Sequence, residues 1–177
     1  MNTESPDEWT VSNAITARGT AQSSAVSWAL NPDGSRTIEQ AVEIARRNGV
    51  HIPSDIHFGV VSVGDGLLDA TTYARYATFR GQQGTLIHWS DLYHDVTGKI
   101  PVIIREDVLA SDEAIVAIFT HEMHELNELR QLFAANNGSM PIERLSEAIG
   151  TGFKGNLHDR AWDAADAAVL RMKGLKP

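Results

Sequence analysis

The most strongly patterned stretch of the chain runs from residue 115 to residue 133. Apolar residues recur there every three or four positions, which predicts one broad apolar face on a helix. This face consists of Ile115, Ile118, Phe119, Met123, Leu126, Leu129 and Phe133. Ser111 is a good N-cap, and an Asn-Asn-Gly sequence ending at Gly138 is a good stop signal, so we expect a helix over 111–136.

Two further patterns predict helices on either side of this segment. Thr37 followed by Gln40 forms a capping-box sequence before an apolar run that ends at Gly49. Asn156 is a suitable N-cap for a last helix that continues to Met172. The apolar face of that last helix consists of Ala161, Trp162, Ala165, Ala168, Val169 and Met172. A short amphipathic helix is also expected over 141–149.

Short β-branched and aromatic runs, bounded by Gly, Pro or turn sequences, predict strands over 56–62, 85–89 and 99–105. Residues 73–79 fit a strand or a helix, and we favour the strand. Pro101 indicates an edge position or the first residues of its strand. Together these elements predict an α+β fold, with a small, largely antiparallel sheet packed under helix 111–136 and the C-terminal helix.

The first 36 residues differ in composition from the rest of the chain. They are rich in Ser, Thr, Ala and Asn, and they end in a turn-like Asn-Pro-Asp-Gly-Ser sequence. We therefore predict a polar lead-in or linker over 1–36 and a single α+β domain over 37–177. A length of 177 residues fits one domain with a sizeable core.

Composition narrows the classes of partner and compartment. The chain is 42% hydrophobic and 21% charged, which is typical of a soluble globular protein, and no apolar run approaches the ~20 residues of a membrane span. The net charge of −8 argues against non-specific binding to nucleic acid and against binding to an anionic membrane surface. No signal-peptide pattern is present, so we expect a cytoplasmic location in the producing cell, with secretion only through a carrier or a larger parent chain.

Four side chains that can bind a metal, His121, Glu122, His124 and Glu125, lie in the middle of helix 111–136. Glu122 projects from the centre of the apolar face, while His121 and Glu125 lie one turn apart on its flank. A carboxylate in a core is costly unless it is paired or bound to a metal. The chain has no cysteine, so any metal must be bound by histidines and carboxylates.

The last helix offers a third ligand, because His158 projects from its apolar face. His121, Glu125 and His158 then predict an open two-histidine, one-carboxylate site that suits Zn²⁺ and also tolerates Fe²⁺ or Mn²⁺. In such a site the bound water is acidified, and Glu122 can take its proton as general base while the water attacks a carbonyl carbon. Asp159 or Asp163 is a candidate to orient a ligand histidine.

Two alternatives use the same residues differently. In a second register, which we rank below the first, His121 and His124 bind the metal together with Glu125 or Glu128. In the other alternative there is no metal, the polar residues form a solvated flank or a buried polar network in a non-catalytic interaction module, and His158 is a core residue.

The arrangement resembles the minimal zincin metallopeptidase plan over residues 99–172. In that plan a strand is followed by an apolar helix bearing a His-Glu-x-x-His motif, and a later helix carries a third ligand. This chain has His121-Glu122-x-x-Glu125, so Glu125 replaces the second histidine. The resemblance implies a metal-dependent hydrolase acting on a protein or peptide.

The amino-acid sequences of segments 112–129 and 157–163 also resemble the variable C-terminal tails of bacterial Rhs-type polymorphic toxins. This resemblance implies an effector domain, delivered into competing cells as part of a larger secreted protein and neutralised by a cognate immunity protein. A metal-dependent nuclease toxin that uses the same residues is the alternative within this class.

Overall fold

The computed structural model describes residues 8–12, 15–16, 35–64, 68, 72–93, 96–150 and 153–177. Helices and small sheets pack together in a mixed α+β arrangement, which confirms the predicted fold class. The helices are α2 (Ile38–Arg47), α3 (Asp112–Ala135), α4 (Ile142–Ile149) and α5 (Leu157–Met172), and two 3-10 turns are η1 (Trp89–Leu92) and η2 (Glu106–Ala110). The strands are β1 (Glu8–Ser12), β2 (Ile15–Thr16), β3 (Ile56–Val61), β4 (Thr72–Arg75), β5 (Thr78–Gln82), β6 (Leu86–His88), β7 (Ile100–Arg105) and β8 (Ser139–Pro141).

The predicted helix caps are present. The Thr37 hydroxyl accepts from the backbone N–H of Gln40, and the Gln40 side chain accepts from the backbone N–H of Thr37, so α2 begins with a complete capping box. Ser111 caps α3 and Asn156 caps α5 in the same way, through side-chain oxygens that accept backbone N–H groups. These local signals set the helix starts, which fixes the phase of each helix face.

The main sheet has the order β2-β4-β7-β3, and two strand pairs, β1–β5 and β6–β8, lie beside it. Every pair is antiparallel except β3–β7, so the prediction of a largely antiparallel sheet is confirmed. Strand β7 is interior, and Pro101 lies near its beginning. Strand β4 pairs with β7 only at Ile103 and Ile104, so the missing N–H of Pro101 interrupts no β4–β7 pairing.

Two of these strands belong to the segment predicted as a lead-in. Strand β1 pairs with β5, and β2 pairs with β4, so residues 8–12 and 15–16 are joined to the sheets by backbone hydrogen bonds. Val11 is 2% exposed and belongs to the core. The other residues of the predicted lead-in up to position 34 lie outside the described part of the chain.

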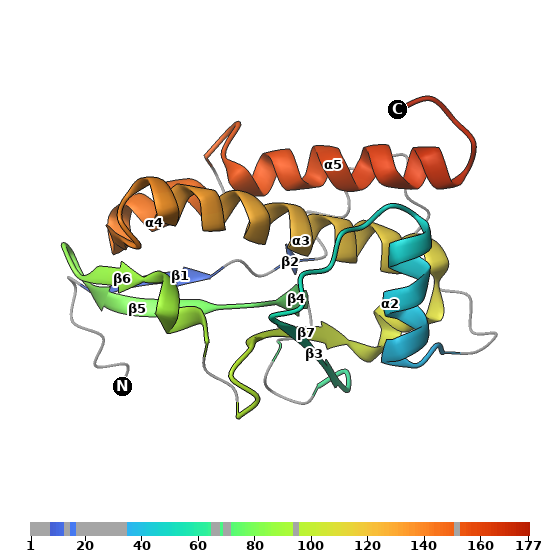
Figure 1. Ribbon diagram of the computed structural model, residues 1–177, viewed down its shortest axis with the longest axis horizontal. Helices are drawn as coiled ribbons and strands as arrows, with labels where there is room; N and C mark the ends of the chain where they lie inside the picture. Colours follow the sequence, from blue (N-terminus) through green and yellow to red (C-terminus); the bar gives the residue numbers. More distant parts are fainter. Residues whose placement is uncertain are drawn as a thin grey trace.

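Helix α3 lies between the strands and α5, so the elements form three layers (Figure 1). We predicted both helices on the sheet, but α5 packs on the far side of α3. The two helices run antiparallel, with Lys173 at one end 3.1 Å from Glu113 and Arg160 at the other end 2.7 Å from Glu128. Because α3 is covered on both sides, the residues from Ala114 to Phe119 are all fully buried.

No helix within the described ranges combines the length and apolar character needed to cross a membrane.

A network around Asp55 fastens α3 to the start of β3 and to η1. The Tyr93 hydroxyl donates to Asp55 Oδ2 at 2.6 Å, and Arg130 Nη2 donates to both carboxylate oxygens at 2.9 and 3.0 Å. The Arg130 guanidinium also lies over the Trp89 ring, 4.9 Å from its centroid. Burial of Asp55 opposes ionisation, but the hydrogen bonds from Tyr93 and Arg130 outweigh it and lower the pKa of Asp55.

We expect Asp55→Asn to destabilise the protein by about 1 kcal/mol at pH 7, since the pair is partly exposed. A carboxyl whose folded-state pKa is lowered contributes stability above its unfolded pKa of about 4, and this contribution is lost as pH falls through the folded-state pKa. Urea unfolding of both proteins between pH 7 and pH 3 measures this effect. The difference between them should shrink at the acidic end, and a difference independent of pH would contradict the assignment.

Candidate metal centre

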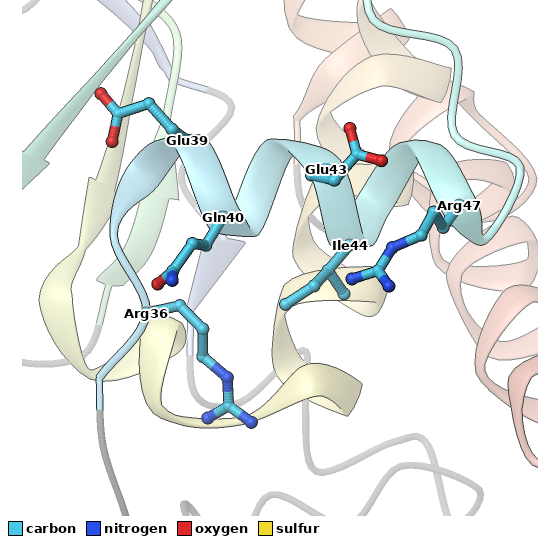
Figure 2. A pocket seen from close by; sticks show the side chains of 6 residues that line it. All are labelled: Arg36, Glu39, Gln40, Glu43, Ile44 and Arg47. Carbon is cyan, nitrogen blue, oxygen red and sulfur yellow. The ribbon is translucent and has the colours of Figure 1, made fainter.

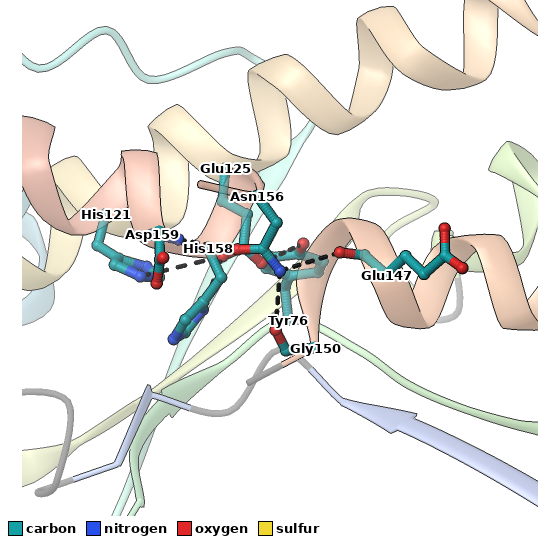
Figure 3. Close-up of polar contacts among 8 residues, drawn as sticks. All are labelled: Tyr76, His121, Glu125, Glu147, Gly150, Asn156, His158 and Asp159. Atoms are coloured by element: carbon teal, nitrogen blue, oxygen red, sulfur yellow. Dashed lines mark hydrogen bonds and ion pairs between the residues drawn. The ribbon is translucent and has the colours of Figure 1, made fainter. Parts of the chain in front are cut away.

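Three side chains predicted as metal ligands come together where α3 and α5 meet. His121 and Glu125 lie one turn apart on α3, and His158 is the second residue of α5. One ligand atom from each of them lies within 4.8 Å of the others (Figure 3). His121 and Glu125 are 0% exposed and His158 is 7% exposed. We call these three residues the triad.

The start of α5 is anchored, and this places His158. Asn156 Oδ1 accepts from the backbone N–H of Asp159 at 3.1 Å. Asn156 Nδ2 donates to the carbonyl oxygens of Glu147 and Gly150 at 3.0 and 2.8 Å. Asn156 therefore caps α5 and ties it to the end of α4, so that His158 is directed toward α3 (Figure 3).

Glu125 uses its two oxygens differently. Oε1 accepts a hydrogen bond from the Tyr76 hydroxyl at 2.7 Å. Oε2 lies 3.1 Å from His158 Nδ1 and 3.9 Å from His121 Nε2. Burial, together with the charge and hydrogen bond of Glu125 and the charge of Glu122, raises the pKa of Tyr76 well above its ordinary value, so its hydroxyl is a donor at neutral pH.

His121 is held as a neutral imidazole. Burial lowers its pKa well below the ordinary value, and the nearby His158 and His124 lower it further. Neither ring nitrogen makes a hydrogen bond of standard geometry within the part of the chain that the structure describes, although the His158 backbone lies near enough to oppose part of the lowering of the pKa. The ring instead packs against Trp162 and His158, with centroid separations of 4.7 and 4.8 Å. A buried polar group without a partner needs an explanation, and a bound ion is one.

The chain matches no protein-family model, no curated protein and no solved structure. The resemblances to zincins and to Rhs-type toxins therefore stay predictions, and the triad alone supports a metal site.

The donor set of the triad suits a divalent ion of intermediate softness. Two imidazoles and one carboxylate are the ligands found at zinc sites that keep a position for water, and they also suit Fe²⁺. The neutral state of His121 keeps a nitrogen lone pair available for coordination. The geometry and the chemistry of these residues thus both fit one divalent cation.

His124 lies outside the triad. Its Nε2 is 3.6 Å from Glu128 Oε1, and Glu128 also pairs with Arg160 at 2.7 Å. The side chains of His124 and Glu128 are 35% and 25% exposed, in contrast to the buried triad. The described residues that group closely enough to bind one metal ion are therefore those of the first predicted set, His121, Glu125 and His158. The second predicted set, in which His121 and His124 bind the metal together, forms no such group among the described residues.

The predicted general base, Glu122, and the predicted orienting residues, Asp159 and Asp163, lie outside the triad. Glu122 is 0% exposed, and its charge contributes to the raised pKa of Tyr76. Asp159 accepts from the backbone N–H of Gly155 at 2.8 Å, and Asp163 is exposed. No described contact joins either aspartate to a triad histidine, so their predicted orienting role has no structural support.

Tyr76 contacts the triad through Glu125 and was not predicted from the sequence. It follows β4 in the turn before β5, in the segment predicted as one continuous strand. A tyrosine in an aromatic-rich strand carries no sequence signal for a contact with a residue 49 positions away. Only the burial of Tyr76 in the structure indicates such a contact, because a buried tyrosine hydroxyl usually has a hydrogen-bond partner.

Two cavities lie away from the triad. One, of about 410 Å³, follows the surface of α2 and is lined by both acidic and basic side chains (Figure 2). Its Arg36 is already engaged with the Ala110 carbonyl oxygen at 2.6 Å and with Asp112 at 2.9 Å. The other, of about 230 Å³, lies on the His124 side of α3 beside the loop that contains His51. Neither cavity is lined by a triad residue.

Proposed function

We propose that this protein is a metal-dependent hydrolase that binds one divalent ion, Zn²⁺, through His121, Glu125 and His158. The observation that carries the proposal is the buried triad, in which the neutral His121 has no hydrogen bond of standard geometry to a described residue and lies close to the carboxylate of Glu125. A bound cation would use the nitrogen lone pairs and would balance the charge of a carboxylate removed from water.

The ion would supply Lewis-acid chemistry and lower the pKa of a bound water. Glu122 is the candidate general base, because it lies one residue along α3 from His121 and is fully buried. A buried carboxylate beside a metal can accept a proton from water and pass it to a leaving group. A peptide or protein substrate follows from the zincin resemblance, and the toxin role with an immunity partner stays a prediction from the second resemblance.

A structural metal site is the second candidate, and the burial of the triad favours it. Structural zinc sites are closed, whereas catalytic ones keep a position open to water or substrate. With exposures of 0%, 0% and 7%, the triad has the burial of a closed site. In this role the ion would join α3 to α5 and contribute directly to folding stability.

Metal analysis of the purified protein tests the step that both candidates share. We expect one equivalent of divalent metal per chain, and we expect this metal to be lost in His121→Ala and in His158→Ala. His124→Ala is the matched control, since this neighbouring α3 histidine lies outside the triad. The absence of stoichiometric metal from the wild type, or unchanged metal content in both ligand variants, would refute the assigned site.

A further inference from the structure

The two oxygens of Glu125 have different partners, and this asymmetry limits how the residue can bind a metal. Oε1 accepts from the Tyr76 hydroxyl at 2.7 Å, which is a short, strong hydrogen bond to a carboxylate. Oε2 is the oxygen near both imidazoles, 3.1 Å from His158 Nδ1 and 3.9 Å from His121 Nε2. Only Oε2 therefore lies within the triad.

Tyr76 is held rigidly enough to maintain this arrangement. It is 3% exposed and lies between β4 and β5, so the strands on both sides restrict its backbone. Glu125, which accepts this hydrogen bond, lies on α3, and α3 is buried between the sheet and α5. The hydrogen bond therefore joins two packed elements, and neither side chain has solvent into which it can turn.

From this geometry we infer that Tyr76 is a positioning residue that restricts Glu125 to one-oxygen metal binding and so favours Zn²⁺ over ions that need more ligands. The inference rests on the proposed metal site. With Oε2 and the two histidines, the protein supplies three ligands, which leaves one position in the tetrahedral arrangement that zinc prefers. Mn²⁺ and Mg²⁺ prefer six ligands that are mostly oxygen, so a site that supplies two imidazoles and a single carboxylate oxygen suits them less well than it suits Zn²⁺.

Loss of the Tyr76 hydroxyl should have a specific chemical consequence. Oε1 would lose its donor, and Glu125 would be able to bind an ion through both oxygens. The coordination number would rise, and the preference for Zn²⁺ would fall. Residues that orient a metal ligand typically contribute 10–100-fold to metal affinity, which sets the size of the expected effect.

The test compares wild type with Tyr76→Phe. We expect Zn²⁺ affinity to fall about 10–100-fold, with a smaller loss for Mn²⁺, so that the Zn²⁺-over-Mn²⁺ preference decreases. Co²⁺ substitution gives a second readout, because four-coordinate Co²⁺ absorbs visible light strongly and six-coordinate Co²⁺ weakly. The wild-type protein should show the intense spectrum and the variant a weaker one.

Tyr93→Phe is the matched control. It also removes a tyrosine hydroxyl that donates to a carboxylate, here at 2.6 Å to Asp55, but that pair lies outside the triad. This variant should lose stability while keeping the wild-type metal affinity and Co²⁺ spectrum. A general effect of losing a tyrosine hydroxyl that donates to a carboxylate would change both variants alike and would contradict the inference.

The outcomes separate this inference from the proposed function. A wild type that binds no metal refutes the metal site itself. A wild type that binds Zn²⁺, with Tyr76→Phe unchanged in affinity and spectrum, refutes only the role of Tyr76. If Tyr76→Phe fails to fold, the wild-type Co²⁺ spectrum still decides, because a six-coordinate spectrum overturns the inference. A tyrosinate signal on metal binding also overturns it, since Tyr76 would then be a ligand.

Discussion

Saturating Zn²⁺ is expected to raise the free energy of unfolding by about 4 kcal/mol when the free ion is at 1,000 times its Kd. The proposed site joins residues on α3 and α5 that are 33 positions apart at Glu125 and His158, and an unfolded chain does not hold them together. For a chain of this length such a gain corresponds to a rise in melting temperature of roughly 8–16 °C. Urea unfolding and thermal scans, each with Zn²⁺ and with a chelator, measure it.

Three variants give this experiment its controls. His121→Ala and His158→Ala should lose most of the Zn²⁺-dependent gain, because each removes one of three protein ligands. His124→Ala should retain the gain, because His124 pairs with Glu128 outside the triad. An equal gain in all four proteins would show that the stabilising ion binds elsewhere on the chain.

Helix positions and helix phases were predictable because both depend on local signals. Caps at Ser111 and Asn156 fix where α3 and α5 begin, and the apolar period fixes which residues face inward. Once both phases were known, the positions of His121 and Glu125 on the flank of the apolar face of α3, and of His158 on the apolar face of α5, followed. The burial of all three agrees with that phasing.

The arrangement around these helices was less predictable, since it depends on contacts between distant segments. Helix α5 packs on α3 rather than on the sheet, and no helical period distinguishes these two surfaces because both are apolar. Strands β1 and β5 pair although they are about 70 residues apart in the sequence, as in the pair of Glu8 with Gln82, and local sequence signals do not fix such a register. Tyr76 was missed for the same reason, because its partner is defined only by the tertiary fold.

Glu122→Gln is expected to abolish hydrolysis while leaving the metal in place. A positioned general base typically contributes 10²–10⁴-fold to the rate, and the amide cannot accept the proton. The substitution keeps the shape of a side chain that is 0% exposed, so packing is preserved. Casein, tRNA and plasmid DNA, each incubated with the Zn²⁺- or Mn²⁺-loaded protein, identify the substrate class before kcat and metal content are compared.

Glu128→Gln is the control for this variant. It neutralises another α3 carboxylate, one that is 25% exposed and paired with Arg160, and it should leave hydrolysis unchanged. Equal loss of rate in both variants would mean that general electrostatics, and not Glu122, set the activity. A wild type that gains stability from Zn²⁺ but cleaves none of the three substrates would favour the structural metal site, because a closed triad can join α3 to α5 without admitting a substrate.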